Sequence, residues 1–155
     1  MKGFISYAHK DAEAYRTFRT HLRAVEQSLG IEFWADEGID PGDRWSAVIA
    51  KAIDNAQVHL LLMSPYFLAS NYILDHELPA IARRLTLGAL VIPVILQDCL
   101  WTHFVGPVQS VPKDAAGDLK PVRSWRPQSK GFHEANLQIS NAIQKRFSLR
   151  PKSVL

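Results

Sequence analysis

The sequence predicts an α/β fold in which helices cover both faces of a doubly wound parallel sheet of about five strands. Short β-favouring runs alternate with amphipathic helical segments along the chain, and this alternation is typical of parallel α/β sheets. The run Val58–Met63 is almost continuously apolar, as expected of a strand that is covered on both faces. At 155 residues, the chain has the length of a single domain.

Five segments have the composition of strands. In the fourth, Pro93 cannot donate to a strand ladder, so we expect it near an edge or a bulge. The fifth is short and follows a long loop with several prolines and glycines. The segments are residues 4–7, 31–34, 58–63, 89–96 and 121–122.

Amphipathic helices are expected between the strands. In residues 12–29 the apolar positions recur every three or four residues, Asp11 stands at the N-cap position, and Gly30 follows the last turn. The same spacing predicts helices over residues 45–56 and 132–147. Between the second strand and the second helix, nine residues contain two glycines, a proline and four acids, which is typical of a surface loop.

Glu77 lies just beyond the carboxyl end of the most apolar strand, on the side where parallel α/β sheets form ligand crevices. Pro79 removes a backbone hydrogen bond from a helix, and it disfavours helical angles at Leu78. The sequence therefore predicts a helix break or a helix start at Glu77. Its carboxylate is either a surface charge that caps this helix or a reactive group that faces a cleft.

The composition narrows the classes of function. The formal net charge is only +3 and the basic residues are scattered, so direct binding of nucleic acid is not expected. A single cysteine, Cys99, excludes an internal disulfide and a multi-cysteine metal cluster. The first residues run straight into a strand, and the longest apolar run is too short to cross a bilayer. We therefore expect a cytoplasmic protein with no membrane partner.

The motifs of several common α/β proteins are absent. The turn after Tyr7 lacks the glycines of a dinucleotide-binding loop, and the chain has no Walker loop. Ser64 stands where a response regulator would carry an aspartate, and it lacks the flanking glycines of a serine hydrolase. These absences exclude activities without assigning one.

Short motifs in a fixed order carry a resemblance to a known family. They are Phe4-Ile-Ser-Tyr7 with His9 and Asp11, Trp34 with the 36–42 loop, Leu62-Met-Ser-Pro-Tyr66 through Ser70, Tyr72 and Glu77, and Val91–Val94 with Trp125. In this order they resemble a Toll/interleukin-1 receptor (TIR) domain of the bacterial branch, over essentially the whole chain. The resemblance implies a flavodoxin-like sheet of five strands in residues 1–149, followed by a polar tail, 150–155, that could link to a further domain of a longer parent protein.

The resemblance also implies an activity, because many bacterial and plant TIR domains and some animal ones cleave NAD+ at the nicotinamide bond. Those enzymes require a glutamate in the helix after the third strand, and Glu77 matches that position. NAD+ would then be a substrate, with no cofactor and no metal. A tryptophan often precedes the glutamate in this helix, whereas Tyr72 and Ile73 stand there in this chain.

The chemistry is compatible with one carboxylate. Glycoside hydrolysis usually uses two, because the leaving oxygen must be protonated. Nicotinamide leaves from a cationic pyridinium and departs neutral, so Glu77 alone could stabilise the cationic transition state. The candidate substrate-binding residues are Ser6, Tyr7, His9, Lys10, Asp43, Arg44, Trp45 and Tyr72.

Each candidate also has a structural interpretation. Tyr7 could pack at a strand end, Trp45 could belong to the core, and His9 and Lys10 could form a solvated turn. Ser64 and Ser70 are expected as helix caps rather than nucleophiles. His76 lacks a metal-ligand partner at a suitable spacing, and Cys99 is expected as a packed thiol.

Family members that are not enzymes associate through the loop after the second strand, which supplies an alternative function. Here the chain would be an adaptor that binds other TIR domains. A third reading is a nucleotide-binding sensor without turnover. For the enzyme, the resemblance implies activation by self-association under a fused or separate sensor domain, in bacterial antiviral defence. The expected assembly residues are Asp36, Gly38, Ile39, Asp40, Pro41 and Gly42.

Overall fold

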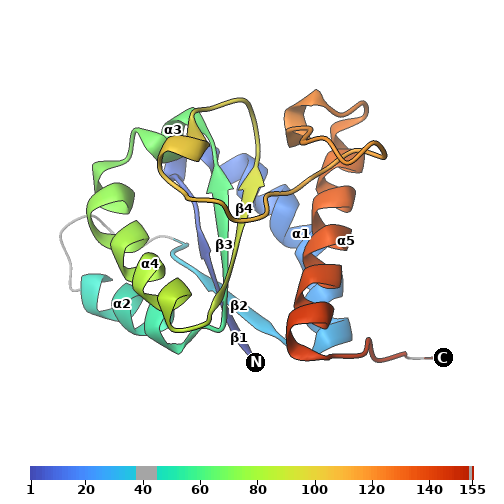
Figure 1. Ribbon diagram of the computed structural model, residues 1–155, viewed down its shortest axis with the longest axis horizontal. Helices are drawn as coiled ribbons and strands as arrows, with labels where there is room; N and C mark the ends of the chain where they lie inside the picture. The colour runs from blue at the N-terminus through green and yellow to red at the C-terminus, as the bar shows by residue number, and fades with distance from the viewer. Residues whose placement is uncertain (38–44, 154) are drawn as a thin grey trace.

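A parallel sheet lies between two layers of helices in the computed structural model, which describes residues 1–37, 45–153 and 155 (Figure 1). Within these residues the sheet has four strands in the order β2-β1-β3-β4, and every neighbouring pair is parallel. The strands are β1 (Lys2–Ser6), β2 (Glu32–Ala35), β3 (Val58–Met63) and β4 (Leu90–Ile95). The predicted α/β class and the parallel sheet are confirmed.

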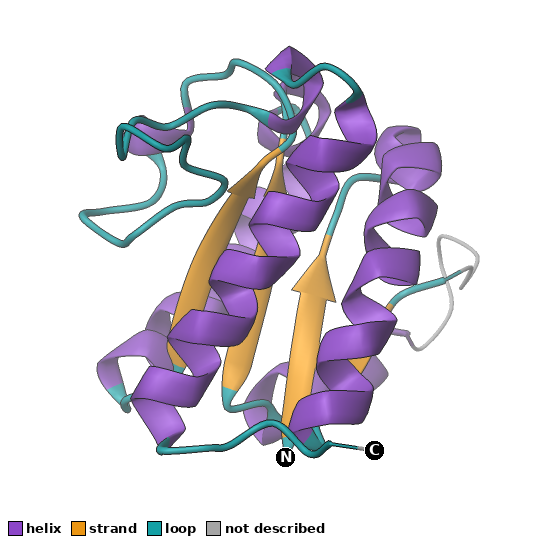
Figure 2. Ribbon diagram, turned by 90° about the vertical axis from the view of Figure 1, so that its right-hand side faces the viewer, coloured by secondary structure: helices purple, strands orange, loops and turns teal. Residues whose placement is uncertain are grey.

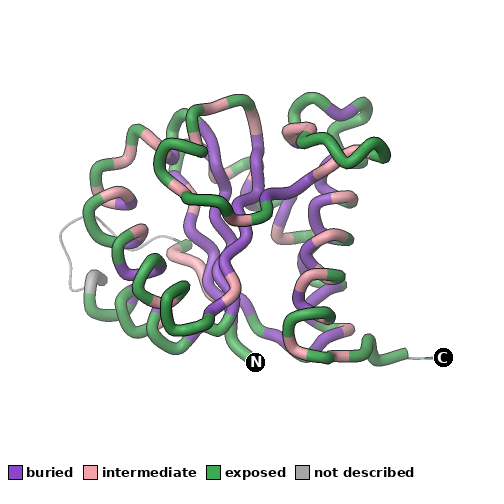
Figure 3. The backbone as a smooth tube through the Cα atoms, in the orientation of Figure 1, coloured by how far each residue is buried: buried purple, intermediate pink, exposed green. Residues whose placement is uncertain are grey.

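Two helices cover each face of the sheet (Figures 1 and 2). On one face lie α1 (Ala12–Leu29) and α5 (Gln128–Phe147), and on the other lie α2 (Trp45–Asn55) and α4 (Leu78–Thr86). Because side chains alternate along a strand, Ile5 and Leu60 join the first core cluster while Phe4 and Leu61 join the second. β3 is buried at every position and β1 and β4 at all but the first, whereas β2 is buried only at Phe33 (Figure 3).

The strongest sequence patterns gave correct boundaries. The apolar run over residues 58–63 forms β3, which is buried at every position. The apolar positions of α1 face the core, and Gly30 ends the helix in the left-handed conformation (φ +65°), which glycine adopts without steric cost. None of the helices in the described residues is long and apolar enough to cross a membrane.

The expected fifth strand at residues 121–122 is wrong. Val122–Ser124 instead form a single 3-10 turn that starts after Pro121. The place beside β4 is occupied by Val111, whose N–H donates to Pro93 O at 2.9 Å and whose carbonyl accepts from Ile95 N at 2.8 Å. Pro112 follows directly and has no N–H, so it cannot extend this pairing into a ladder. The expected edge position of Pro93 is confirmed, since β4 is the last strand of the described sheet.

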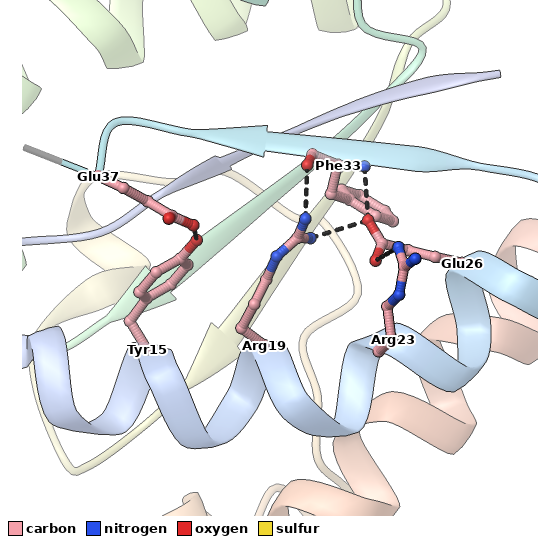
Figure 4. A network of polar contacts seen from close by, with 6 residues as sticks. All are labelled: Tyr15, Arg19, Arg23, Glu26, Phe33 and Glu37. Atoms are coloured by element: carbon pink, nitrogen blue, oxygen red, sulfur yellow. Dashed lines mark hydrogen bonds and ion pairs between the residues drawn. The ribbon is translucent and has the colours of Figure 1, made fainter.

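A buried carboxylate fastens β2 to α1 (Figure 4). Glu26 accepts hydrogen bonds from Phe33 N at 2.8 Å and from Arg19 at 2.9 Å. Arg23 adds a third contact at 3.3 Å, and Arg19 also donates to Phe33 O at 2.9 Å. Every partner of this buried charge is thus a hydrogen-bond donor, which offsets the cost of removing the carboxylate from water.

We expect Glu26→Ala to destabilise the protein by about 3 kcal/mol, because it leaves Arg19 and the Phe33 N–H without their partner. Glu32→Ala is the matched control, since within the described residues the Glu32 carboxylate forms an exposed pair with Lys2, and exposed pairs contribute little. Urea unfolding of both variants measures the difference. Equal, small losses would show that the Glu26 network does not hold β2.

Candidate functional site

Glu77 ends a π-helical turn, Ile73–Glu77, which continues directly into α4. The N–H of Leu78 donates to Ile73 O, five residues earlier. The wider turn accommodates Pro79, whose ring would clash with a carbonyl in a regular α-helix. The expected break in α-helical geometry at Glu77 is therefore found, but the expectation for Leu78 is wrong. Leu78 has helical angles (φ −58°, ψ −44°), because the chain changes pitch there instead of leaving the helix.

The carboxyl group of Glu77 is removed from water. The residue is 8% exposed, and burial is the main cause that raises its pKa from 4.5 to about 7. The negative charge of Asp36 raises the pKa further, while the hydroxyl of Ser6 lowers it. Ser6 is fully buried at the end of β1, and its contact with the carboxyl falls short of well-formed hydrogen-bond geometry. Glu77 is thus a buried acid that titrates near neutral pH.

A pocket of roughly 270 Å³ opens beside Glu77, between the π-helical turn and α2. Its apolar wall includes Ile49 and Ile53, and its polar wall includes Tyr72, His76 and Arg83. This volume is just below the roughly 300–1,000 Å³ typical of ligand pockets. The described walls therefore match a ring-sized group rather than a whole dinucleotide.

Tyr72, a candidate substrate-binding residue, lies on this wall. Its ring contacts the ring of His76, with the centroids 4.9 Å apart. Burial, followed by the negative charges of Glu77 and Asp36, raises the pKa of Tyr72 to about 12. The structure therefore brings two of the candidate substrate-binding residues, Tyr72 and Ser6, together with Glu77.

Tyr7 and His9 follow β1, and both contact Asp36, the residue after β2. The hydroxyl of Tyr7 donates to Asp36 O at 2.8 Å, and His9 Nε2 lies 3.7 Å from a carboxylate oxygen of Asp36. The ring of Tyr7 stacks on Tyr15 at 4.0 Å with the planes nearly parallel. This supports the packing interpretation of Tyr7. A pocket of roughly 320 Å³ lies against these rings, and Glu37 also lines it.

Tyr15 also contacts the residues that follow β2, and the sequence did not predict this contact. Its hydroxyl donates to the carboxylate of Glu37, so two stacked tyrosines hold the two residues after β2. The helical spacing identified Tyr15 only as a core position of α1. No local signal could find the contact, because Tyr15 and Glu37 meet only after β2 has paired with β1.

Two polar side chains join the loops after β1 and β3. Asp11 stands at the expected N-cap of α1, but its predicted capping role is wrong, because its side chain makes no cap hydrogen bond. It instead accepts from the hydroxyl of Ser64, which also caps α3 (Pro65–Leu68) by accepting from Phe67 N at 3.0 Å. Ser70 accepts from Ile73 N at 3.3 Å. The predicted capping roles of both serines are confirmed.

The remaining candidates are peripheral or undescribed. Lys10 is exposed, and its ammonium lies 5.6 Å from the ring centroid of Tyr66, as expected of a solvated turn. Cys99 is half-buried, and burial raises the pKa of its thiol. Within the described ranges, no three metal-ligating side chains cluster around His76 or elsewhere. The predicted residues Gly38, Ile39, Asp40, Pro41, Gly42, Asp43 and Arg44, and the side chain of Trp45, lie outside the described residues.

Comparison with known proteins identifies relatives of the chain. The family model described as the TIR domain matches residues 4–132. A protein of Sinorhizobium fredii (strain NBRC 101917 / NGR234), described as uncharacterized protein y4lF, is 33% identical over 144 residues. That match covers 92% of this chain, which spans 42% of the length of the relative.

Among solved structures, the TIR domain of the Toll-related receptor TRR-2 from Hydra magnipapillata is similar to this chain. The match covers 70% of this chain and 82% of that one, at 22% identity and a TM-score of 0.46. The family assignment rests on the family model, which spans most of the chain.

The raised pKa of Glu77 predicts that Glu77→Gln stabilises the fold at alkaline pH. The folded protein keeps this proton between pH 4.5 and about 7, where the unfolded chain has released it, so the wild type loses stability as the pH rises through that range. The loss reaches about 3 kcal/mol, at about 1.4 kcal/mol per pH unit. In urea unfolding at pH 4 and pH 8.5, the free energy of unfolding of the variant, relative to that of the wild type, should be higher at pH 8.5. The same difference at both values would contradict the raised pKa.

Proposed function

The chain belongs to the TIR domain family, and on that premise we propose that it is an NAD+ nucleosidase in which Glu77 is the catalytic carboxylate. The observation that carries the proposal is a buried glutamate with a pKa of about 7, beside a pocket between the π-helical turn, α4 and α2. Strongly shifted acids in clefts are frequent at functional sites. The products would be nicotinamide and ADP-ribose or a cyclic ADP-ribose.

The reaction breaks the bond between the ribose C1′ and the pyridinium nitrogen. The electron pair of this bond goes to the ring, which leaves as neutral nicotinamide, and the ribose becomes an oxocarbenium-like cation. The ionised form of Glu77 would stabilise that cation, and its low-polarity surroundings strengthen the attraction. Water or a nucleophile of the same molecule then adds to C1′ and releases one proton.

The position of Glu77 suits both parts of this reaction. An acid with a pKa near 7 is partly ionised at neutral pH and remains basic enough to accept a proton from the attacking water. The pocket beside it has the size of a ring-bearing group, and Tyr72 and Ser6 lie against the same carboxyl. The nicotinamide ribose half of NAD+ would therefore occupy the described pocket.

We also propose that self-association activates the enzyme, in bacterial antiviral defence and under a fused or separate sensor domain. TIR domains commonly associate with one another. Asp36, the first residue after β2, raises the pKa of Glu77 and therefore lies near the candidate site. A neighbouring copy that docks beside Asp36 would act directly on the catalytic edge.

Glu77→Gln should lower NAD+ turnover by roughly 100- to 1,000-fold, because it removes the charge that stabilises the cation and keeps the shape of the side chain. Nicotinamide release, followed chromatographically, measures the effect. Wild-type kcat/KM should fall as the pH drops below about 7, where Glu77 becomes protonated. Glu134→Gln, on α5 at the other face of the sheet, is the control. Undiminished turnover in Glu77→Gln would remove Glu77 from the reaction.

Specific activity should rise with protein concentration if assembly completes the site. Nicotinamide release per molecule, measured from dilute to concentrated protein alongside light scattering, tests this. Constant specific activity across a range in which the protein assembles would contradict activation by self-association. Assembly with no nicotinamide release at any concentration would instead identify the chain as an adaptor.

A further inference from the structure

We propose that Asp36 is a second carboxylate of the Glu77 site, and that the two acids together select the cationic nicotinamide ring over its neutral forms. The inference rests on the proposed cleavage of NAD+, because it names the part of the substrate that this site recognises. It assigns Asp36 a role in ligand recognition, which is separate from its predicted role in assembly.

The sheet register places Asp36 next to Ser6. Ile5 of β1 pairs with Ala35 of β2, so the following residues of the two strands, Ser6 and Asp36, leave the sheet side by side at its carboxyl edge. Ser6 is the β1 residue whose hydroxyl contacts Glu77. Asp36 and Glu77 therefore approach the same point from neighbouring elements.

The alternation of side chains directs Asp36 towards the same face as Glu77. Two residues earlier, Trp34 packs with Phe4 in the cluster under α2 and α4, with the ring centroids 5.8 Å apart. Side chains two positions apart on an extended segment point to the same face. Asp36 thus continues the side of β2 that faces the π-helical turn, and its side chain is only 16% exposed.

Two side chains of the segment that follows β1 hold Asp36 in this position. The Tyr7 hydroxyl fixes its backbone carbonyl at 2.8 Å, and His9 lies 3.7 Å from its carboxylate. Tyr7 is itself held by its stack on Tyr15, which binds the next residue, Glu37. The orientation of Asp36 is therefore set before a ligand arrives, which reduces the entropic cost of binding.

The electrostatics agree with this geometry. The charge of Asp36 raises the pKa of both Glu77 and Tyr72. Two carboxylates in such an arrangement resist simultaneous ionisation unless a cation lies with them.

Other charges around the pocket do not form a comparable acid pair. Asp75, His76 and Arg83 also line the pocket, and the described lining residues of α2 are apolar. The charge that shifts the pKa of Glu77 is instead that of Asp36, which is not among the lining residues of this pocket. The oxidised nicotinamide ring carries the positive charge that would relieve the repulsion between the two acids, whereas reduced or free nicotinamide is neutral.

The test uses a ligand that cannot be cleaved. The 1-methylnicotinamide cation carries a methyl group in place of the ribose, and neutral nicotinamide is its uncharged counterpart. NMR titration of the wild type should show tighter binding of the cation than of nicotinamide. Asp36→Asn should reduce this preference by about tenfold, the order expected for losing one partly shielded charge contact. It should also move the titration midpoint of the Glu77 carboxyl, followed by ¹³C labelling, down towards its ordinary value.

Glu37→Gln is the matched control, because it removes one negative charge from the adjacent residue, whose carboxylate is bound to Tyr15. It should leave both the preference for the cation and the Glu77 midpoint unchanged. Asp36→Glu keeps the charge and should retain most of the preference. Backbone NMR spectra of each variant confirm that the fold is intact. Equal behaviour of Asp36→Asn and Glu37→Gln would overturn the proposal.

The same variants separate this inference from the proposed function. If the wild type cleaves NAD+ but Asp36→Asn keeps the full preference for the cation, the acid pair is wrong and the NAD+ nucleosidase stands. If no NAD+ is cleaved while Asp36→Asn alone loses the preference, the acid pair stands as a cation-selective site and the proposed reaction fails.

Discussion

The hydrogen bond between Ser64 and Asp11 is the contact on which the arrangement of the carboxyl edge depends. Ser64 follows β3 and precedes α3, while Asp11 lies between β1 and α1, so one bond joins two crossover connections that are far apart in sequence. Ser64 also caps α3, from which the chain reaches the π-helical turn and Glu77. Burial raises the pKa of Asp11 above its ordinary value, and the Ser64 hydrogen bond and the charge of Arg123 offset only part of this shift.

The acid at the edge of the sheet also illustrates a conflict between stability and reactivity. A glutamate at this depth is more stable when protonated, whereas stabilisation of a cation requires the ionised form. The π-helical turn holds the side chain inside in spite of this cost, because the packing of Ile73 and the continuation into α4 fix its direction. Buried, strained or unfavourable groups of this kind are common at functional sites.

The sequence predicted those features that depend on local pattern. The apolar run of β3, the helical spacing of α1 and the capping serines were correct because each is determined within a few residues. The prediction of a fifth strand was wrong, because Pro121–Val122 has a strand-like composition but Val111 occupies the place beside β4. Glu77 could be identified from its position and from the family motif. The surroundings of Glu77, including Asp36 and Tyr15, depend on strand register, which a single sequence does not display.

In both edge strands of the described sheet, β2 and β4, backbone groups near the middle of the strand are already hydrogen-bonded and cannot pair with an added strand. On β2, the outward-facing N–H and C=O of Phe33 are bound to Glu26 and Arg19. On β4, Val111 takes the outward-facing groups of Pro93 and Ile95. Unpaired edges are the usual route to β-augmentation and to amyloid-like stacking. Copies of this domain at high local concentration would therefore associate through helix and loop surfaces. Their dissociation would not require the separation of a continuous intermolecular sheet.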